Sequence, residues 1–74
     1  MIDQEAAISI AKDAARTQGW AVVDPIEALL RRDWFGRPKR WEIRTNIRNR
    51  GGPKARFVVD ATDGHIVDQG YVPL

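Results

Sequence analysis

The 74-residue sequence has no cysteine and only one histidine, and this scarcity removes most metal and redox chemistry. Without cysteine there can be no disulfide bridge, thiolate zinc site or thiol nucleophile. Ser9 is the only serine, so His65 has no evident nucleophile partner. We therefore expect no catalytic residue, no metal and no cofactor, and a protein that is not an enzyme.

Long hydrophobic runs are also missing. No stretch approaches the roughly 18 consecutive apolar residues of a membrane span, and residues 1–15 lack the basic and apolar segments of a secretory signal. We expect a cytoplasmic protein with no membrane partner. A single domain over residues 1–74 has only a small core, and this favours a homodimer that shares core or a sheet edge.

The charges are segregated along the chain, although the net charge is only +2. Residues 31–56 hold ten of the 12 basic residues and two acids, which gives this segment +8. The remainder holds two basic residues and eight acids, which gives −6. The basic segment is therefore where an anionic partner would be steered.

The N-terminal segment has the signals of a helix over residues 3–18. Asp3 can act as the N-cap, and Gly19 supplies the stop. Between them, alanine and isoleucine recur at helical spacing on one side. A face made mostly of alanine can approach its neighbour closely, and we expect that neighbour to be a sheet.

Residues 20–35 carry two conflicting patterns. Asp24-Pro25-Ile26-Glu27 resembles a helix capping box with proline at the first helical position. Against this, an alternation typical of a half-buried strand runs through the segment, with Ile26, Ala28, Leu30 and Trp34 on one side and Glu27, Leu29, Arg31 and Asp33 on the other. We favour a strand at 26–34, because the segments that follow predict a sheet that needs it.

Three further strands are predicted at 41–48, 55–61 and 65–71, connected by turns at 35–38 and 49–53. The first of these has the clearest period of two, which places residues 41, 43, 45 and 47 on a core face. Its other face is polar and basic, with Arg40, Glu42, Arg44, Asn46 and Arg48. The predicted fold is α+β, with one N-terminal helix packed on a four-stranded antiparallel sheet.

The sequence FVVDATDGHIV, at residues 57–67, contains the chain's only candidate metal or acid/base cluster. Asp60, Asp63 and His65 offer ligand atoms, but the alternating oxygens and distal glutamate of a calcium loop are missing, as is a second histidine or cysteine. Gly64 tolerates positive φ, and the aspartates can accept hydrogen bonds from nearby backbone. We interpret the cluster as the turn between two strands.

Three segments together resemble the small PepSY-like domains: the helix beginning Glu5-Ala6-Ala7-Ile8, the strand Trp41-Glu42-Ile43, and residues 57–67. The sequence departs from the family where Asp63 stands in place of the usual threonine before the glycine. The resemblance implies a cystatin-like arrangement of a helix on an antiparallel sheet. It also implies a module that binds peptides or restrains proteases, with no catalytic motif.

Two kinds of anionic partner fit the basic segment. We favour a protein or acidic peptide, bound by a small non-enzymatic interaction module. The alternative is a nucleic acid, with arginines on phosphates and aromatic rings on bases. Trp34, Phe35 and Tyr71 are candidate anchors, although Trp34 and Phe35 fit equally well as a cap over the open end of the core. The predicted partner-binding residues are Arg31, Trp34, Arg40, Arg44, Arg48 and Arg56.

Overall fold

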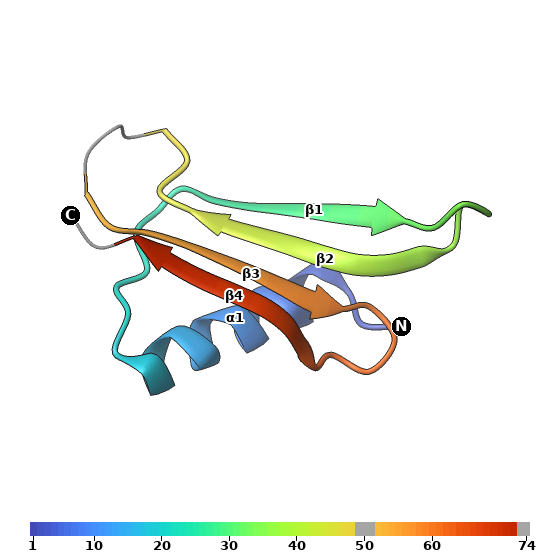
Figure 1. The fold of residues 1–74 in the computed structure, drawn as a ribbon, viewed down its shortest axis with the longest axis horizontal. Helices are drawn as coiled ribbons and strands as arrows, with labels where there is room; N and C mark the ends of the chain where they lie inside the picture. The colour runs from blue at the N-terminus through green and yellow to red at the C-terminus, as the bar shows by residue number, and fades with distance from the viewer. Residues whose placement is uncertain (49–51, 73–74) are drawn as a thin grey trace.

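The computed structural model describes residues 1–48 and 52–72. One helix, α1 (Gln4–Gln18), precedes four strands, β1 (Ile26–Arg32), β2 (Pro38–Thr45), β3 (Lys54–Asp60) and β4 (Ile66–Val72). The strands form an antiparallel sheet in the order β1-β2-β3-β4. Helix α1 packs on one face of this sheet (Figure 1). The predicted α+β class and element order are confirmed.

Helix α1 begins and ends at the residues that the sequence indicated. The Asp3 side chain accepts a hydrogen bond from the Ala6 backbone N–H at 2.8 Å, which satisfies one of the free donors of the first turn. At the other end, Gly19 adopts the left-handed conformation with φ 74°, and the Trp20 N–H bonds back to the Ala15 carbonyl at 2.8 Å. This is a glycine-based helix stop.

The core lies between α1 and the sheet and is thin on the helix side. The helix contributes only alanine to the fully buried layer, at Ala7, Ala11 and Ala15. The sheet contributes the bulk, with Ile43, Phe57 and Val59 among its buried side chains. Trp41 is also buried, as predicted, and its Nε1 donates to the Ile2 carbonyl at 3.1 Å.

Residues 26–32 form a strand, so the strand interpretation of the ambiguous segment is confirmed and the helix alternative is wrong. The strand ends at Arg32, two residues earlier than predicted. Trp34 therefore lies in the turn that follows and does not continue the alternation of the buried face.

Strand β2 spans Pro38–Thr45, whereas the period of two predicted 41–48. The alternation stops at Asn46, which has a positive φ of 57° and is buried, not solvent-facing. Ile47 is exposed, and Arg48 lies beyond the strand, so Arg48 does not share a strand face with Arg40 and Arg44. Residues 49–51 of the turn predicted at 49–53 lie outside the described residues.

Candidate functional site

The face of the sheet opposite α1 carries charged side chains of both signs. Because strand side chains alternate, the pairing register puts every second residue of each strand on this open face. Five are basic and four are acidic: Arg31, Arg40, Arg44, Lys54 and Arg56, against Glu27, Glu42, Asp60 and Asp68. The excess on this face is a single positive charge, because the sheet register adds acidic residues of the other strands to the predicted face of Arg40, Glu42 and Arg44.

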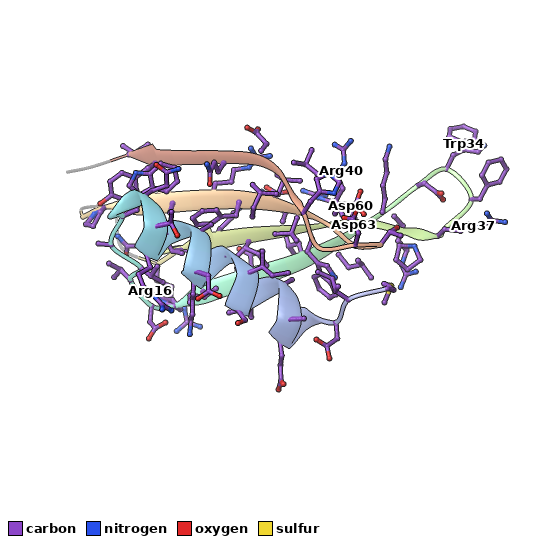
Figure 2. The ribbon with its side chains drawn as sticks, turned by 90° about the horizontal axis from the view of Figure 1, so that it is seen from below. Arg16, Trp34, Arg37, Arg40, Asp60 and Asp63 are labelled. Atoms are coloured by element: carbon purple, nitrogen blue, oxygen red, sulfur yellow. The ribbon has the colours of Figure 1, made fainter. Side chains whose placement is uncertain are left out.

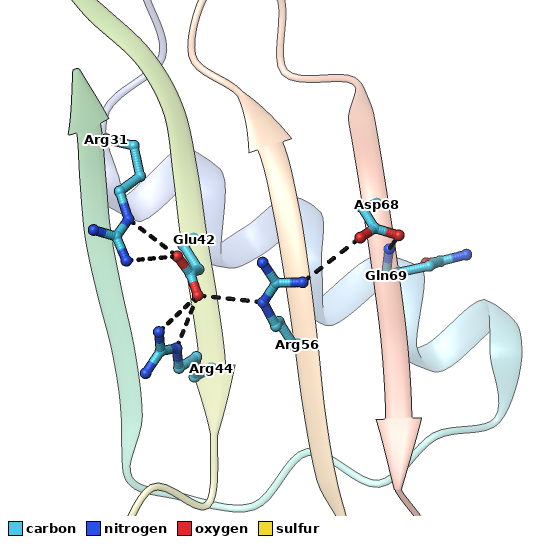
Figure 3. A network of polar contacts seen from close by, with 6 residues as sticks. All are labelled: Arg31, Glu42, Arg44, Arg56, Asp68 and Gln69. Carbon is cyan, nitrogen blue, oxygen red and sulfur yellow. Dashed lines mark hydrogen bonds and ion pairs between the residues drawn. The ribbon is translucent and has the colours of Figure 1, made fainter. Parts of the chain in front are cut away.

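Glu42 is the centre of an ion-pair network on the open face (Figure 3). Its Oε1 accepts hydrogen bonds from Arg44 Nη2 at 2.8 Å and from Arg56 Nε at 3.2 Å. Its Oε2 accepts from Arg31 Nε at 3.1 Å. Arg56 also reaches Asp68 at 3.6 Å, so the network crosses all four strands.

The Glu42 side chain is only 8% exposed, while its three arginine partners are 44–59% exposed. The hydrogen bond from Arg44 is the largest cause that lowers the Glu42 pKa to about 2, and Arg56 and Arg31 add to it against the cost of burial. Glu42 is therefore ionised at neutral pH. It engages three of the six residues predicted to bind a partner, which reduces their availability to an external anion.

Arg40 is placed differently from these three arginines. It lies on the open face opposite Arg31 on one side and Asp60 on the other, and Figure 2 shows it near Asp60 and Asp63. Within the described part of the chain it makes no ion pair shorter than 4.0 Å. Of the predicted arginines on the strands, Arg40 is the one most available to a partner.

The turn between β1 and β2 presents two adjacent aromatic side chains to solvent. Trp34 is 92% exposed and Phe35 is 82% exposed, and Figure 2 shows Trp34 at the far end of the hairpin, away from the helix. We call Trp34 and Phe35 the aromatic tip. Neither residue covers the core, so the cap interpretation is wrong.

The aromatic tip has a defined shape because Asp33 holds the turn. Asp33 Oδ1 accepts hydrogen bonds from the backbone N–H groups of Phe35 and Arg37, both at 2.9 Å. The backbone of Asp33 and Arg37 is joined by a further bond at 2.9 Å, and Gly36 takes a φ of 78°. The run Asp33-Trp34-Phe35-Gly36 is a turn signature, with aspartate first and glycine at the left-handed position.

Basic residues flank the aromatic tip in the sequence. Residues 31–40 contain five basic residues and one acid, which gives +4, and the acid, Asp33, is used inside the turn. We call the five basic residues the basic collar: Arg31, Arg32, Arg37, Lys39 and Arg40. Two of the five, Arg31 and Arg40, also lie on the open face of the sheet, so the collar continues from the turn onto that face.

Tyr71, a third candidate anchor, is used inside the fold. Its ring stacks on Trp20 with centroids 5.2 Å apart and an interplanar angle of 5°. Trp20 in turn contacts Phe57, with centroids 5.8 Å apart. Tyr71 therefore completes the edge of the core.

The cluster of Asp60, Asp63 and His65 forms the turn between β3 and β4, as the sequence predicted. Asp60 Oδ1 accepts from the Thr62 N–H at 2.7 Å, and Asp63 Oδ1 accepts from the His65 N–H at 3.0 Å. Gly64 has φ 82°. The three candidate ligand atoms lie within 4.8 Å of one another, but the carboxylate bonds to the backbone already account for this arrangement. That the cluster binds no metal stays a prediction.

A depression of about 650 Å³ lies on the open face, where β2 and β3 separate. Its charged rim consists of Glu27, Arg44, Lys54 and Arg56, and Val72 is among its apolar residues. Arg44 and Arg56 are already bonded to Glu42. The aromatic tip is therefore the stronger candidate, because its side chains make no such internal contact.

Comparisons of the chain with protein-family models, with curated proteins and with solved structures found no match. Among the described residues, no helix is both long and apolar enough to cross a membrane.

Proposed function

We propose that the protein is a small non-enzymatic interaction module that binds an acidic protein or peptide through the aromatic tip and the basic collar. The observation that carries this proposal is the exposure of Trp34 and Phe35, at 92% and 82%. The other four aromatic residues, Trp20, Trp41, Phe57 and Tyr71, are buried or half-buried in or around the core.

Exposed aromatic pairs are unusual because each ring gives up a large hydrophobic contribution to folding. Aromatic residues are also the side chains that most often dominate protein–protein binding energy. The Asp33 hydrogen bonds fix the turn before any partner arrives. A preformed anchor loses less conformational entropy on binding than a disordered loop does.

The basic collar favours an acidic partner. Residues 31–40, which include the aromatic tip, carry a net charge of +4. Charged groups at the rim of an interface mainly raise the association rate and select the partner. The collar would thus guide an acidic surface to the anchor, and the rings would supply most of the affinity.

The resemblance to PepSY-like domains supports the same proposal, because it implies peptide binding or protease restraint. In this proposal the protein acts in the cytoplasm. The predicted site is revised accordingly: Trp34 and Arg40 belong to the proposed surface, whereas Arg44 and Arg56 serve mainly the Glu42 network. Arg31 belongs to the basic collar but is also bonded to Glu42.

A nucleic acid is the second candidate partner, and one observation favours it. The sequence placed Trp41 on the face opposite the arginines, which left no stacking platform beside them. The aromatic tip now provides two exposed rings next to the basic collar. Stacking of a base on such a ring, with arginine on the phosphates, is the usual mode of single-strand binding.

The test is a peptide selection followed by a direct titration. A random peptide library would be selected on the native protein, and the selected sequences would be titrated against wild type and a Trp34→Ala/Phe35→Ala variant. The matched control is Val22→Ala/Val67→Ala, which removes two other exposed apolar side chains.

We expect acidic peptides with an apolar residue to be selected, with affinity at least tenfold weaker for the tip variant and unchanged for the control. Equal affinity for all three proteins would overturn the proposal. If no peptide is selected but a single-stranded oligonucleotide binds with a steep salt dependence that the tip variant loses, the second candidate replaces the first.

A further inference from the structure

Strand β1 forms one edge of the sheet, since its only strand partner in the described structure is β2 (Figure 3). It spans seven residues, IEALLRR, without proline or glycine. Such an edge presents unpaired backbone donors and acceptors and is open to pairing with another strand. The opposite edge, β4, is less suited because it contains Gly70. Both edge strands have a register irregularity against their neighbour, which in β1 lies at Arg31 and Arg32.

The sequence of β1 is complementary to itself when two copies run antiparallel. If Leu29 of each copy lies on the two-fold axis, Ala28 faces Leu30 of the second copy, and Glu27 faces its Arg31. The two-fold symmetry generates each of these two pairs a second time on the other side of Leu29. Glu27, Leu29 and Arg31 all belong to the open face, so two ion pairs would flank a central leucine pair.

Neighbouring registers lose this match. The outward-facing N–H and C=O groups of two antiparallel copies meet only when the two-fold axis passes through a residue. The registers nearest to the Leu29 centre are therefore those with the axis at Leu30 or at Ala28. With the centre at Leu30, Glu27 would face Asp33 and Leu29 would face Arg31. With the centre at Ala28, Glu27 would face Leu29, and Arg31 would face Pro25. For pairs in which both residues lie within β1, only the Leu29 centre places opposite charges across from each other.

The geometry of Arg31 is compatible with a second carboxylate. Arg31 uses Nε and Nη2 on Glu42, each at 3.1 Å. Its Nη1 makes no hydrogen bond or ion pair among the described residues, and its side chain is 59% exposed. A guanidinium has five donors in a fixed fork and can engage two carboxylates at once.

We infer that two copies of this chain pair through β1 in antiparallel register about Leu29, which joins their sheets into one sheet of eight strands. Both helices would then lie on one face of the combined sheet and both Glu42 networks on the other. Because the two β1 strands run in opposite directions, the two aromatic tips lie at opposite ends. The pairing leaves the aromatic tip accessible and does not depend on it, although it engages Arg31 of the basic collar.

The absence of cysteine makes a disulfide test specific, since any bridge must form at an introduced residue. In a Leu29→Cys variant the two cysteines would face each other across the axis. Directly opposed residues of antiparallel strands have Cα atoms about 4.5–5.5 Å apart, which is within disulfide range. We expect rapid, nearly complete cross-linking under mild oxidation, whereas Val67→Cys, an exposed control on β4, should cross-link slowly.

The register is tested by mixing two variants. Glu27→Cys and Arg31→Cys should form the mixed disulfide in preference to either homodimer, since only the mixed pair is directly opposed. In sedimentation equilibrium, the wild type should dimerise, and Glu27→Lys should raise the dissociation constant by about tenfold, because it replaces two attractive pairs by two repulsive ones.

A wild type that sediments as a monomer up to high micromolar concentration would overturn the inference. So would Leu29→Cys cross-linking no faster than Val67→Cys, or mixed cysteine variants that give the three possible disulfides in statistical proportion. Far-UV circular dichroism on each variant separates these outcomes from simple unfolding.

Discussion

The two hairpins of this protein end in turns on the same side of the sheet, and both turns are held by aspartate, yet they differ in nearly everything else. The β1–β2 turn projects into solvent with the aromatic tip and the basic collar (Figures 1 and 2). The β3–β4 turn lies beside the start of the chain, where the Ile2 N–H bonds to the Ala61 carbonyl at 2.8 Å. It carries Asp60 and Asp63, not arginines.

The difference shows that local turn chemistry does not decide what a turn does. Both turns use an aspartate oxygen as a backbone acceptor and a glycine at positive φ. In the β3–β4 turn, Gly64 lies against Ile2 and Ile10, whereas nothing lies within 4 Å of the corresponding Cβ position at Gly36. The β3–β4 turn is therefore packed into the fold, whereas the β1–β2 turn remains available for contact with a partner.

The largest effect is expected at Glu42, where the two hairpins are joined. Its carboxylate bonds Arg31 and Arg44 of the first hairpin and Arg56 of the second. Its pKa of about 2 lies below the ordinary 4.5, so it stabilises the fold fully above pH 4.5 and progressively less as the pH falls toward 2. With the exposed arginines discounted, we expect Glu42→Gln to lower the free energy of unfolding at pH 7 by about 2 kcal/mol.

Urea unfolding at pH 7 and at pH 2–3 measures this effect. The Glu42→Gln variant should lose much of the wild-type pH dependence below 4.5. Asp68→Asn is the matched control, because Asp68 bonds the same Arg56 but is 66% exposed, and we expect it to change stability by less than about 0.5 kcal/mol. An equal loss in both variants would contradict the central role of Glu42.

The two turn glycines give the next largest effect. Gly36→Ala introduces only the strain of a positive φ, about 1 kcal/mol, since the added Cβ meets no atom. Gly64→Ala introduces the same strain and places a Cβ 2.9 Å from Ile10 Cδ1, so we expect about 2 kcal/mol in total. Thermal and urea unfolding of both variants would show which one loses more stability. A larger loss in the free energy of unfolding for Gly36→Ala would contradict the conclusion that the β3–β4 turn is the packed one.

Asp33 should affect the shape of the aromatic tip more than the stability of the fold. Asp33→Ala removes the acceptor for the Phe35 and Arg37 N–H groups, but water can replace it at this exposed site, so we expect at most about 1 kcal/mol. Amide exchange by NMR should accelerate at Phe35 and Arg37 and stay unchanged at Thr62. In the counterpart variant Asp60→Ala, exchange should accelerate at Thr62 and stay unchanged at Phe35 and Arg37. If exchange at Phe35 is unchanged in Asp33→Ala, the carboxylate does not hold the turn.

The smallest effect concerns Asp63. The backbone N–H of His65 is the main cause that lowers the Asp63 pKa, and the His65 side chain adds to it. The contribution to stability is therefore present above the ordinary pKa of Asp63 and is lost below it, but the side chain is 63% exposed and the effect is small. NMR titration should find the pKa below 3.8, and His65→Ala should restore it only in part, because the backbone donor remains.

Much of the fold followed from local signals in the sequence. Asp3 and Gly19 marked the ends of α1, and the alternation from Trp41 to Thr45 marked β2. The aspartates and glycine of residues 60–64 marked the second turn. Each signal depends on residues close together in the chain, so it can be interpreted without knowledge of the tertiary structure.

The errors arose where distant residues decide the outcome. Two of the arginines that bond Glu42 lie 11 and 14 residues away from it in the sequence. Only the strand register brings them to Glu42, so the pairing of these charges on the open face could not be predicted from local patterns. Asn46 is buried because its side chain donates to the Pro53 carbonyl at 3.1 Å, across the β2–β3 connection. The turn at the aromatic tip is an exception, since Asp33-Trp34-Phe35-Gly36 already had the pattern of a turn, although its exposure depends on packing.

The alanine face of α1 has a consequence for how the molecule opens. Because Ala7, Ala11 and Ala15 have no side chain beyond Cβ, the helix backbone lies close to the centre of the sheet. Amide hydrogens of β2 and β3 lie beneath it in strands that are bonded to a neighbour on both sides, so we expect them to exchange with solvent only when the domain unfolds. Those of β4 exchange by fraying at the edge, so the slowest-exchanging core consists of two inner strands under one helix.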